Sequence, residues 1–302
     1  MKYNELTVSN ILKLHSSGES SRQIARILGL SKSGVNNVIN RNKFGSAKAK
    51  VLFLDLENAP SIAAAFQRFN VNLSPNHILE EGGWLLSIAW SWMNSKKIEG
   101  EALTSAEAVM KNDYRLVSKC WELIEEADIV IAHNGDRFDL PLIKARGAYH
   151  GFTALRKIKS VDTLKIAKSM KFESNKLDSL GNYLGVGRKE THTGITLWIE
   201  CMEGNKQSLK KMLSYNKQDV QLLMDVYYKI RACDPNPPNM GLFGAMNQPV
   251  CKVCGSDHLA PTGNVVKAGS SSYEEVQCLS CGARARTRQS LTTKDQRKNL
   301  LA

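Results

Sequence analysis

An apolar segment that carries two carboxylates on one side constrains the fold of this chain most. Residues 51–57 have the sequence VLFLDLE, in which apolar side chains surround Asp55 and Glu57. Such a run predicts a buried β-strand. Side chains at i and i+2 of a strand lie on the same face, so both carboxylates point the same way. Two like charges at one buried edge repel each other, and a bound cation relieves that repulsion.

Further acids occur where the chain is expected to return to this edge. Asp139 follows a second predicted buried strand, IVIAH, after a short loop, and Asp219 lies in a long amphipathic segment near residue 220. Tyr215 precedes Asp219 by four residues, which places both on one face of a helix. Carboxylate oxygens favour Mg²⁺ or Mn²⁺. Two such ions ~3.5–4 Å apart activate water and stabilise a leaving oxygen. We therefore predict two catalytic Mg²⁺ or Mn²⁺ ions.

The order of the segments predicts an α/β core with small flanking modules. A meander of strands followed by alternating helices and strands is typical of a mixed sheet. A stretch with four prolines and two glycines follows this core and is expected to be a linker. The predicted parts are a helix-turn-helix domain at 1–45, the core at 50–233, the linker at 234–250, a zinc ribbon at 251–283 and a loosely ordered basic tail at 284–302.

Five stretches of the core resemble a known enzyme family when taken together and in order. They are VLFLDLENAP, EEADIVIAHNGDRFDLPLI, SVDTLKIAK, SNKLDSLGNYLGVGRK and MLSYNKQDVQLL. The set resembles the DnaQ-like 3′–5′ exonucleases with four acids and a tyrosine, which have an RNase H fold. It is most similar to the phage and bacterial group related to the exonuclease domain of family B DNA polymerases.

This resemblance implies the activity and the roles of the site residues. The implied reaction is metal-dependent 3′–5′ removal of nucleoside monophosphates. Asp55, Glu57, Asp139 and Asp219 match the metal-binding acids, and Tyr215 matches the tyrosine that orients water. Asn58 stands where the family often has threonine and is a candidate contact to the 3′-terminal nucleotide. Asn134 is a second candidate contact, although its loop position also favours a structural role.

The N-terminal segment has the spacing of a helix-turn-helix. Ala25, Gly29 and Val35 supply the small, turning and apolar positions of that motif, with Ser21 and Ser31 as predicted N-caps. The motif resembles the DNA-binding helix-turn-helix of resolvases and small regulators, while a three-helix bundle that binds protein, or binds nothing, remains the alternative. The candidate DNA contacts are Arg22, Lys32, Ser33, Asn36, Asn37 and Arg41.

The C-terminal region contains two matched Cys-x-x-Cys-Gly motifs. Cys251 and Cys254 form the first pair, and Cys278 and Cys281 form the second after a 23-residue spacer. Four cysteines in this pattern predict one structural Zn²⁺, because a four-thiolate site leaves no position open for water. A disulfide is the alternative. The adjoining Arg284, Arg286 and Arg288 are candidate contacts to a phosphate backbone, with a protein-docking ribbon as the other interpretation.

The distribution of charge favours a nucleic-acid partner. The net charge is +12, of which residues 1–50 carry +7 and residues 251–302 carry +4. Basic ends around a balanced core are typical of a protein that holds a polyanion. The sequence has no signal segment and no apolar run of about 18 residues, so we expect a cytoplasmic protein without membrane contact.

These observations predict a DNA-directed 3′–5′ exonuclease, with RNA as an alternative substrate. A replication or recombination protein is a further candidate partner. Two other hypotheses remain open at this point. One is a structure-specific, resolvase-like endonuclease on an RNase H fold, and the other is a DNA-binding regulator with a nuclease-like core.

Overall fold

The structure is a computed structural model that describes residues 7, 10–11, 13–14, 19–43, 49–67, 69–188, 194–243 and 248–300, excluding the side chains at 37 and 39–43. It divides into two compact units, Lys50–Asn236 and a second that combines Met1–Ala49 with Pro237–Ala302. Within the described part of the chain, no helix combines the length and the apolar character needed to cross a bilayer.

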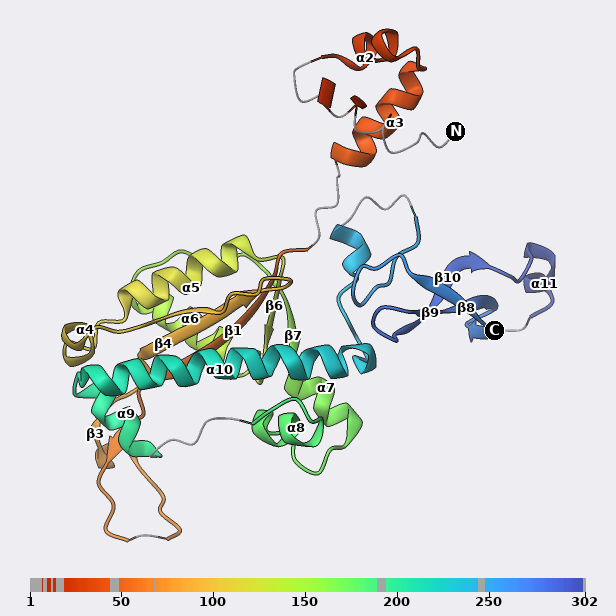
Figure 1. Cartoon of the computed structure of the whole chain (residues 1–302). Helices are drawn as coiled ribbons and strands as arrows, with labels where there is room; N and C mark the ends of the chain where they lie inside the picture. The colour runs from red at the N-terminus through yellow and green to blue at the C-terminus, as the bar shows by residue number, and fades with distance from the viewer. Residues whose placement is uncertain are drawn as a thin grey trace. The chain divides into compact units, whose positions relative to one another are not determined.

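The central unit contains a five-stranded mixed sheet in the order β5-β4-β1-β6-β7 (Figure 1). β1 pairs antiparallel with β4 and parallel with β6, and β7 extends the parallel part. This arrangement confirms the predicted α/β class with a mixed sheet. The strands are β1 Val51–Asn58, β4 Leu85–Trp92, β5 Glu99–Ala102, β6 Ile129–Ala132 and β7 Lys159–Asp162.

The two faces of β1 have different roles. Leu52, Leu54 and Leu56 belong to the apolar core that also contains side chains of α5 (Tyr114–Glu126) and α6 (Asp139–Tyr149). The opposite face carries Phe53, Asp55 and Glu57. Helix α10 (Lys206–Ile230) packs across that face, where the rings of Phe53 and Tyr227 lie 5.5 Å apart. The acids therefore lie between the sheet and α10.

Several elements do not follow from the sequence pattern. Residues 105–126, whose apolar side chains have a continuous helical periodicity, form two helices, α4 (Ser105–Val109) and α5, because Lys111 adopts a left-handed conformation (φ 52°) between them. A hairpin of β2 (Ile62–Ala63) and β3 (Ile78–Glu80) interrupts the path from β1 to β4. Strands of two or three residues are too short to show an alternating apolar and polar pattern in the sequence. The remaining helices of this unit are α7 Thr163–Met170, α8 Leu177–Tyr183, α9 Ile195–Met202 and the short 3₁₀ turns Pro75–His77 and Arg231–Cys233.

In the N-terminal segment, α2 (Ser21–Leu28) and α3 (Lys32–Lys43) are joined by a tight turn at Gly29. Gly29 has φ 63°, a conformation that glycine adopts at low cost. Ala25 and Val35 are buried together with Ile11, Ile24 and Val38. The N-cap of α2 is Ser20 rather than the predicted Ser21, because Ser20 forms a capping box with Gln23. Ser31 accepts a hydrogen bond from the N–H of Gly34 at 3.1 Å, as an N-cap residue does.

The C-terminal segment forms a three-stranded antiparallel sheet of β8 (Leu259–Ala268), β9 (Ser271–Cys278) and β10 (Arg284–Ser290), followed by α11 (Lys294–Lys298). The prediction of a loosely ordered tail from residue 284 is wrong for β10 and α11. β10 completes the sheet by pairing with β9. The polar sequence of β10 does not predict a strand, because β10 is held by backbone hydrogen bonds to β9 and not by an apolar face of its own. Upstream, a short 3₁₀ turn (Met240–Phe243) lies where the linker was predicted, and the N–H of Met240 bonds the carbonyl of Lys252 at 2.7 Å.

A buried carboxylate connects α6 to the start of β4. Asp113 is fully buried and accepts hydrogen bonds from the Arg146 guanidinium at 2.6 and 2.8 Å and from the N–H of Leu85 at 2.9 Å. Nε2 of His150 lies 2.6 Å from the same carboxylate. Burial raises the pKa of Asp113, but the hydrogen bonds from Arg146, His150 and Leu85 outweigh burial and hold the pKa below its usual value. This contact fixes the helix whose first residue is Asp139.

We expect Asp113→Ala to lower the free energy of unfolding by about 3–5 kcal/mol at pH 7, because it leaves Arg146 without its buried counter-charge. Since the folded-state pKa is depressed, the contribution of Asp113 is present above about pH 4 and is lost as the pH falls below that value. Urea unfolding between pH 7 and pH 3.5 measures both effects. Glu122→Ala, on the exposed face of α5, is the control and should change stability little. A loss below about 1 kcal/mol for Asp113→Ala contradicts this account.

Candidate metal centres

Three carboxylates from two elements meet between the sheet and α10. Asp55 and Glu57 extend from β1 and Asp219 from α10, and one oxygen of each lies within 4.8 Å of the others. Asp219 is 1% exposed, while Asp55 and Glu57 are half-buried. Three negative charges this close repel strongly in a partly buried site. A cation bound among these carboxylates would relieve that repulsion.

The donor set fits a hard divalent cation. All three side chains offer only oxygen, the ligand type that Mg²⁺ and Mn²⁺ prefer. The partial exposure of Asp55 and Glu57 leaves both carboxylates accessible from solvent. Tyr215 lies one helical turn before Asp219, is 6% exposed, and packs edge-on against Trp198 with ring centroids 6.2 Å apart. Of the four acids predicted from the sequence, the fold brings Asp55, Glu57 and Asp219 into one group.

Asp139 lies beside this group but is not one of the three. It begins α6 and is 4% exposed. Burial, together with the nearby charge of Asp162, raises the pKa of Asp139 to about 7, although hydrogen bonds from the backbone N–H groups of Asp139 and Leu56 favour the charged form. Because Leu56 separates Asp55 from Glu57 in β1, this contact places Asp139 at the edge of the group. A cation bound nearby would favour the ionised carboxylate.

A buried amide orients Asp55, and the sequence analysis missed it. Nδ2 of Asn216 donates to Oδ2 of Asp55 at 2.6 Å, and the hydroxyl of Ser87 donates to Oδ1 of Asn216 at 3.2 Å. Asn216 and Ser87 are both 0% exposed. Ser87 lies opposite Glu57 in the β1–β4 pairing, so the chain of bonds spans both strands and α10. The signal available in the sequence was a polar residue on the buried face of the last helix, between Tyr215 and Asp219.

The loop after β6 is held by side chains and by backbone geometry. The N–H of Asn134 donates to Asp162 at 2.8 Å, and Asn134 adopts a left-handed conformation with φ 65°. His133 contacts the hydroxyl of Thr163 at 2.9 Å and the carbonyl of Asn175 at 3.0 Å. Asn58 lies at an irregularity of the β1–β4 pairing, and its side chain donates to the carbonyl of Ala59 at 3.1 Å.

The four predicted zinc ligands converge. One sulfur from each of Cys251, Cys254, Cys278 and Cys281 lies within 4.8 Å of the others, and the pairs Cys251–Cys281 and Cys254–Cys278 are 3.6 Å apart. Thiolates ~2.3 Å from a tetrahedral Zn²⁺ are ~3.8 Å apart, whereas a disulfide requires ~2.05 Å. Burial raises the pKa of the Cys278 thiol, but hydrogen bonds from the backbone N–H groups of Cys281 and Ser280 outweigh it and bring the pKa down to about 7. The donor set fits one Zn²⁺.

The predicted nucleic-acid contacts outside the core lie mainly on exposed surface. Arg284, Arg286 and Arg288 alternate along β10 and are all exposed, and the guanidinium of Arg286 lies 3.8 Å from the ring centroid of Tyr273. In the N-terminal segment, Arg22, Lys32 and Ser33 are exposed and Asn36 is half-buried. The side chains of Asn37 and Arg41 lie outside the described part of the structure.

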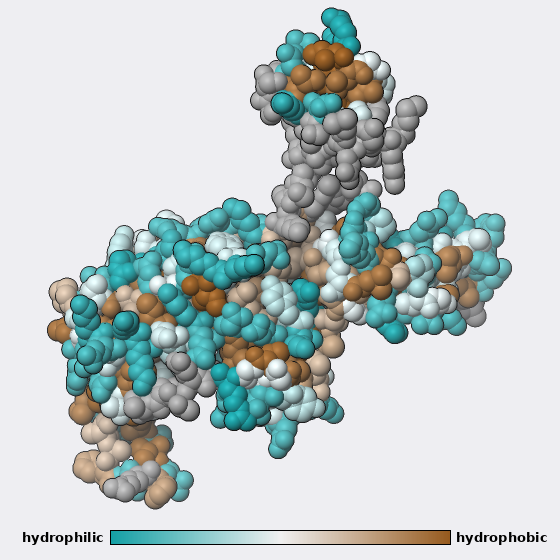
Figure 2. Space-filling model, in the orientation of Figure 1, coloured by the Kyte–Doolittle hydropathy of each residue, from teal (hydrophilic) through white to brown (hydrophobic). Residues whose placement is uncertain are grey.

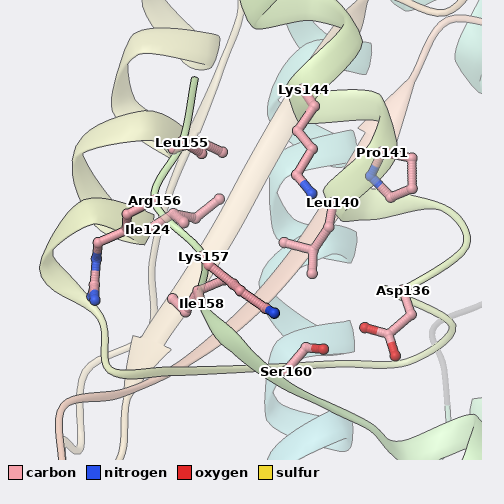
Figure 3. Close-up of a pocket in the computed structure, with 10 residues that line it drawn as sticks. All are labelled: Ile124, Asp136, Leu140, Pro141, Lys144, Leu155, Arg156, Lys157, Ile158 and Ser160. Atoms are coloured by element: carbon pink, nitrogen blue, oxygen red, sulfur yellow. The ribbon is translucent and has the colours of Figure 1, made fainter. Parts of the chain in front are cut away.

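A pocket of about 390 Å³ lies elsewhere in the central unit, between α5, α6 and β7 (Figure 3). Lys144, Arg156 and Lys157 extend around an apolar floor that includes Leu140. Asp136, at the rim, pairs with Lys165 at 2.6 Å. None of the predicted site residues lines this pocket, so it is a feature separate from the acidic group.

Comparison with known proteins identifies the fold of the central unit. Residues 84–231 match the family model described as RNase_H superfamily. A DNA polymerase from Methanocaldococcus jannaschii is 26% identical over 117 residues, which are 38% of this chain and 7% of that protein. The family B DNA polymerase from the hyperthermophilic archaeon Pyrobaculum calidifontis aligns with 61% of this chain and 25% of its own chain, at 15% identity and a TM-score of 0.44. The central unit thus has an RNase H-like fold over the residues that match this family model.

Proposed function

We propose that this protein is a metal-dependent 3′–5′ exonuclease that acts on DNA and releases nucleoside monophosphates. The observation that carries the proposal is the approach of Asp55, Glu57 and Asp219 to within 4.8 Å of one another, from β1 and α10. Bringing these acids together costs free energy because their charges repel, and a bound divalent cation would offset that cost. The RNase H-like fold and the similarity to an archaeal DNA polymerase support a nucleic-acid substrate.

In this proposal the four acids hold two Mg²⁺ or Mn²⁺ ions. When bound, such ions polarise the phosphodiester and lower the pKa of water. Asp55, Glu57 and Asp219 supply the central ligands, and Asp139 adds a fourth carboxylate from the start of α6. Tyr215 orients the attacking water, and Asn216 holds Asp55 in place through its 2.6 Å hydrogen bond. Asn58, just after the acids in β1, contacts the 3′-terminal nucleotide, and Asn134 contacts the strand from the loop after β6.

The flanking modules would retain the enzyme on its substrate. The N-terminal helices present Arg22 and Lys32 to DNA as a helix-turn-helix, and the zinc ribbon presents the arginines of β10 to the phosphate backbone. Tyr273 holds Arg286 in a stacked position, which lowers the entropy lost on binding. Zn²⁺ has a structural role here. A replication or recombination protein would be an additional partner, and RNA an alternative substrate.

The decisive experiment supplies linear single-stranded DNA, its RNA counterpart and a circular single strand with Mg²⁺ or Mn²⁺. We expect 5′-labelled linear DNA to shorten from the 3′ end while the circle stays intact. Asp219→Asn should lower the rate by at least about 100-fold, because even residues that only orient metal ligands contribute 10–100-fold. Circular dichroism confirms that the variant is folded. Cleavage of the circle would instead identify an endonuclease. DNA binding without any cleavage would identify a regulator.

We expect Asn216→Ala to lower activity and Mn²⁺ affinity by about 10–100-fold, because Asp55 loses the donor that fixes its orientation. Asn216→Asp should be more damaging, since it places a further negative charge against Asp55. Isothermal titration with Mn²⁺ and single-turnover hydrolysis measure the two effects separately. Ser214→Ala, on the exposed side of the same helix, is the matched control. If Asn216→Ala binds Mn²⁺ with wild-type affinity, Asn216 does not support the metal site.

We expect one Zn²⁺ per chain, bound by the four cysteines. Cys254→Ser or treatment with a strong chelator should release the ion and make β8–β10 sensitive to proteolysis, because a segment of this size has little apolar core of its own. Elemental analysis and limited proteolysis with mapping of the cut sites measure this. Cys233→Ser, an exposed cysteine outside the group, should keep the full zinc content. Zinc content that is unchanged in Cys254→Ser contradicts the assignment.

A further inference from the structure

The pocket between α5, α6 and β7 combines an apolar floor with positive charge (Figure 3). We name it the basic pocket. It has a volume of about 390 Å³, and its lining residues come from these three elements and the loops that adjoin them. None of the lining residues belongs to β1 or α10, the elements that carry Asp55, Glu57 and Asp219. The proposed function therefore gives this pocket no role.

The floor of the basic pocket is aliphatic. Ile124 and Leu140 are buried in the core of the central unit, while Leu155 and Ile158 pack against that core and remain partly exposed. A ligand with an apolar face would remove this remaining surface from water, which is favourable. Figure 2 shows that apolar surface near α5 forms small patches among hydrophilic side chains. Such a divided surface fits a small ligand better than a broad protein interface.

Two ammonium groups next to this floor have no counter-charge. Figure 3 shows Lys144, from α6, and Lys157, from the segment before β7, extending toward the space beside Leu140. Both lysines are exposed, and neither forms an ion pair with any other residue that the structure describes. Their positive charges are therefore available to a ligand.

The other charged groups of the basic pocket already have partners. The carboxylate of Asp136 pairs with Nζ of Lys165 at 2.6 Å. The guanidinium of Arg156 donates to the carbonyl of Ala127 and lies 3.8 Å from the carboxylate of Glu125. These pairs compensate each other, so an anion that enters the pocket meets the two charges of the free lysines.

The charge and the size of the basic pocket select a class of small molecule. A phosphomonoester carries about −1.5 to −2 charges at pH 7, which matches two ammonium groups, whereas a single carboxylate carries only one. Lysine binds phosphate as a compact charge with three donors. Every nucleobase has an apolar aromatic face that can cover an aliphatic floor. A volume of about 390 Å³ lies in the range of pockets that hold small molecules.

We propose that the basic pocket binds a nucleoside 5′-monophosphate, with its phosphate between Lys144 and Lys157 and its base against Leu155 and Ile158. This site is additional to the acidic group and needs no divalent cation. The proposal does not depend on the proposed function, because binding requires no hydrolysis. If that function holds, the ligand is a product of the reaction, and the pocket binds it apart from the acids.

Isothermal titration of the full-length chain with thymidine 5′-monophosphate tests the site, without added Mg²⁺ or Mn²⁺. Under these conditions the carboxylates of the acidic group repel phosphate and do not contribute. Thymidine lacks the phosphate and inorganic phosphate lacks the base, so these two are the reference ligands. We expect one nucleotide per chain and at least about tenfold weaker binding of each reference ligand. The absence of saturable nucleotide binding, or equal binding of either reference ligand, overturns the proposal.

Two charge-reversal variants locate the binding. Lys144→Glu/Lys157→Glu should weaken nucleotide binding at least about tenfold, because two attractive contacts become repulsive. Lys96→Glu/Lys229→Glu changes the net charge of the chain by the same amount at exposed positions outside the pocket, and it should bind as the wild type does. An equal loss in both variants shows that the nucleotide responds only to net charge, which contradicts a defined site.

A floor variant separates the apolar contact from the charge. Leu155→Ser should weaken nucleotide binding about fourfold or more and leave the binding of inorganic phosphate unchanged. Thermal unfolding followed by circular dichroism establishes that this variant is folded. An unchanged affinity for the nucleotide in folded Leu155→Ser removes the base from the floor and overturns the proposed arrangement.

Photolabelling gives a location that does not depend on any variant. The wild-type chain is irradiated with 8-azidoadenosine 5′-monophosphate, and the labelled peptides are mapped. We expect the label within residues 124–160, and an excess of unlabelled thymidine 5′-monophosphate should suppress it. Label confined to the N-terminal or C-terminal segments would place the nucleotide on their basic side chains and refute the pocket.

Discussion

Repulsion between carboxylates is the constraint around which the central unit is organised. Asp55, Glu57 and Asp219 are held within 4.8 Å by elements that the chain cannot easily separate. β1 is the middle strand of the sheet, and α10 packs along it through Phe53 and Tyr227. The apolar packing on both faces supplies the free energy that keeps the acids together. A divalent cation bound among the three carboxylates would relieve this repulsion.

The surroundings of the acids control their charge and direction. Asn216 and Ser87 fix one carboxylate of the group through a buried chain of hydrogen bonds. Asp139 is deeply buried near Asp162, and this burial together with the charge of Asp162 raises the pKa of Asp139 to about 7. The Asp113–Arg146 pair holds the far part of α6 and so fixes the position from which Asp139 enters.

The two flanking segments are small and rely on different means of stability. The N-terminal helices share a compact core around Ile24 and Val35, with Gly29 setting the angle between them. The C-terminal segment has few buried side chains, and two of its buried residues are Cys251 and Cys278. A metal ion bound by the four cysteines would cross-link a segment with so little core. Both segments carry exposed basic side chains.

The sequence by itself determined the α/β class with its mixed sheet, because apolar periodicity is a local property, and ligand spacing pointed to the four cysteines and three of the acids that the fold brings together. It did not determine the β2–β3 hairpin, the division of the 105–127 segment or the ordering of β10, since each depends on a turn or on a neighbouring strand rather than on its own pattern. The role of Asn216 also appeared only with the fold, because it arises from a contact across 161 positions of the chain. Local patterns thus pointed to candidate residues, and only the packing of α10 on β1 decided which of their side chains touch, because that contact joins segments far apart in sequence.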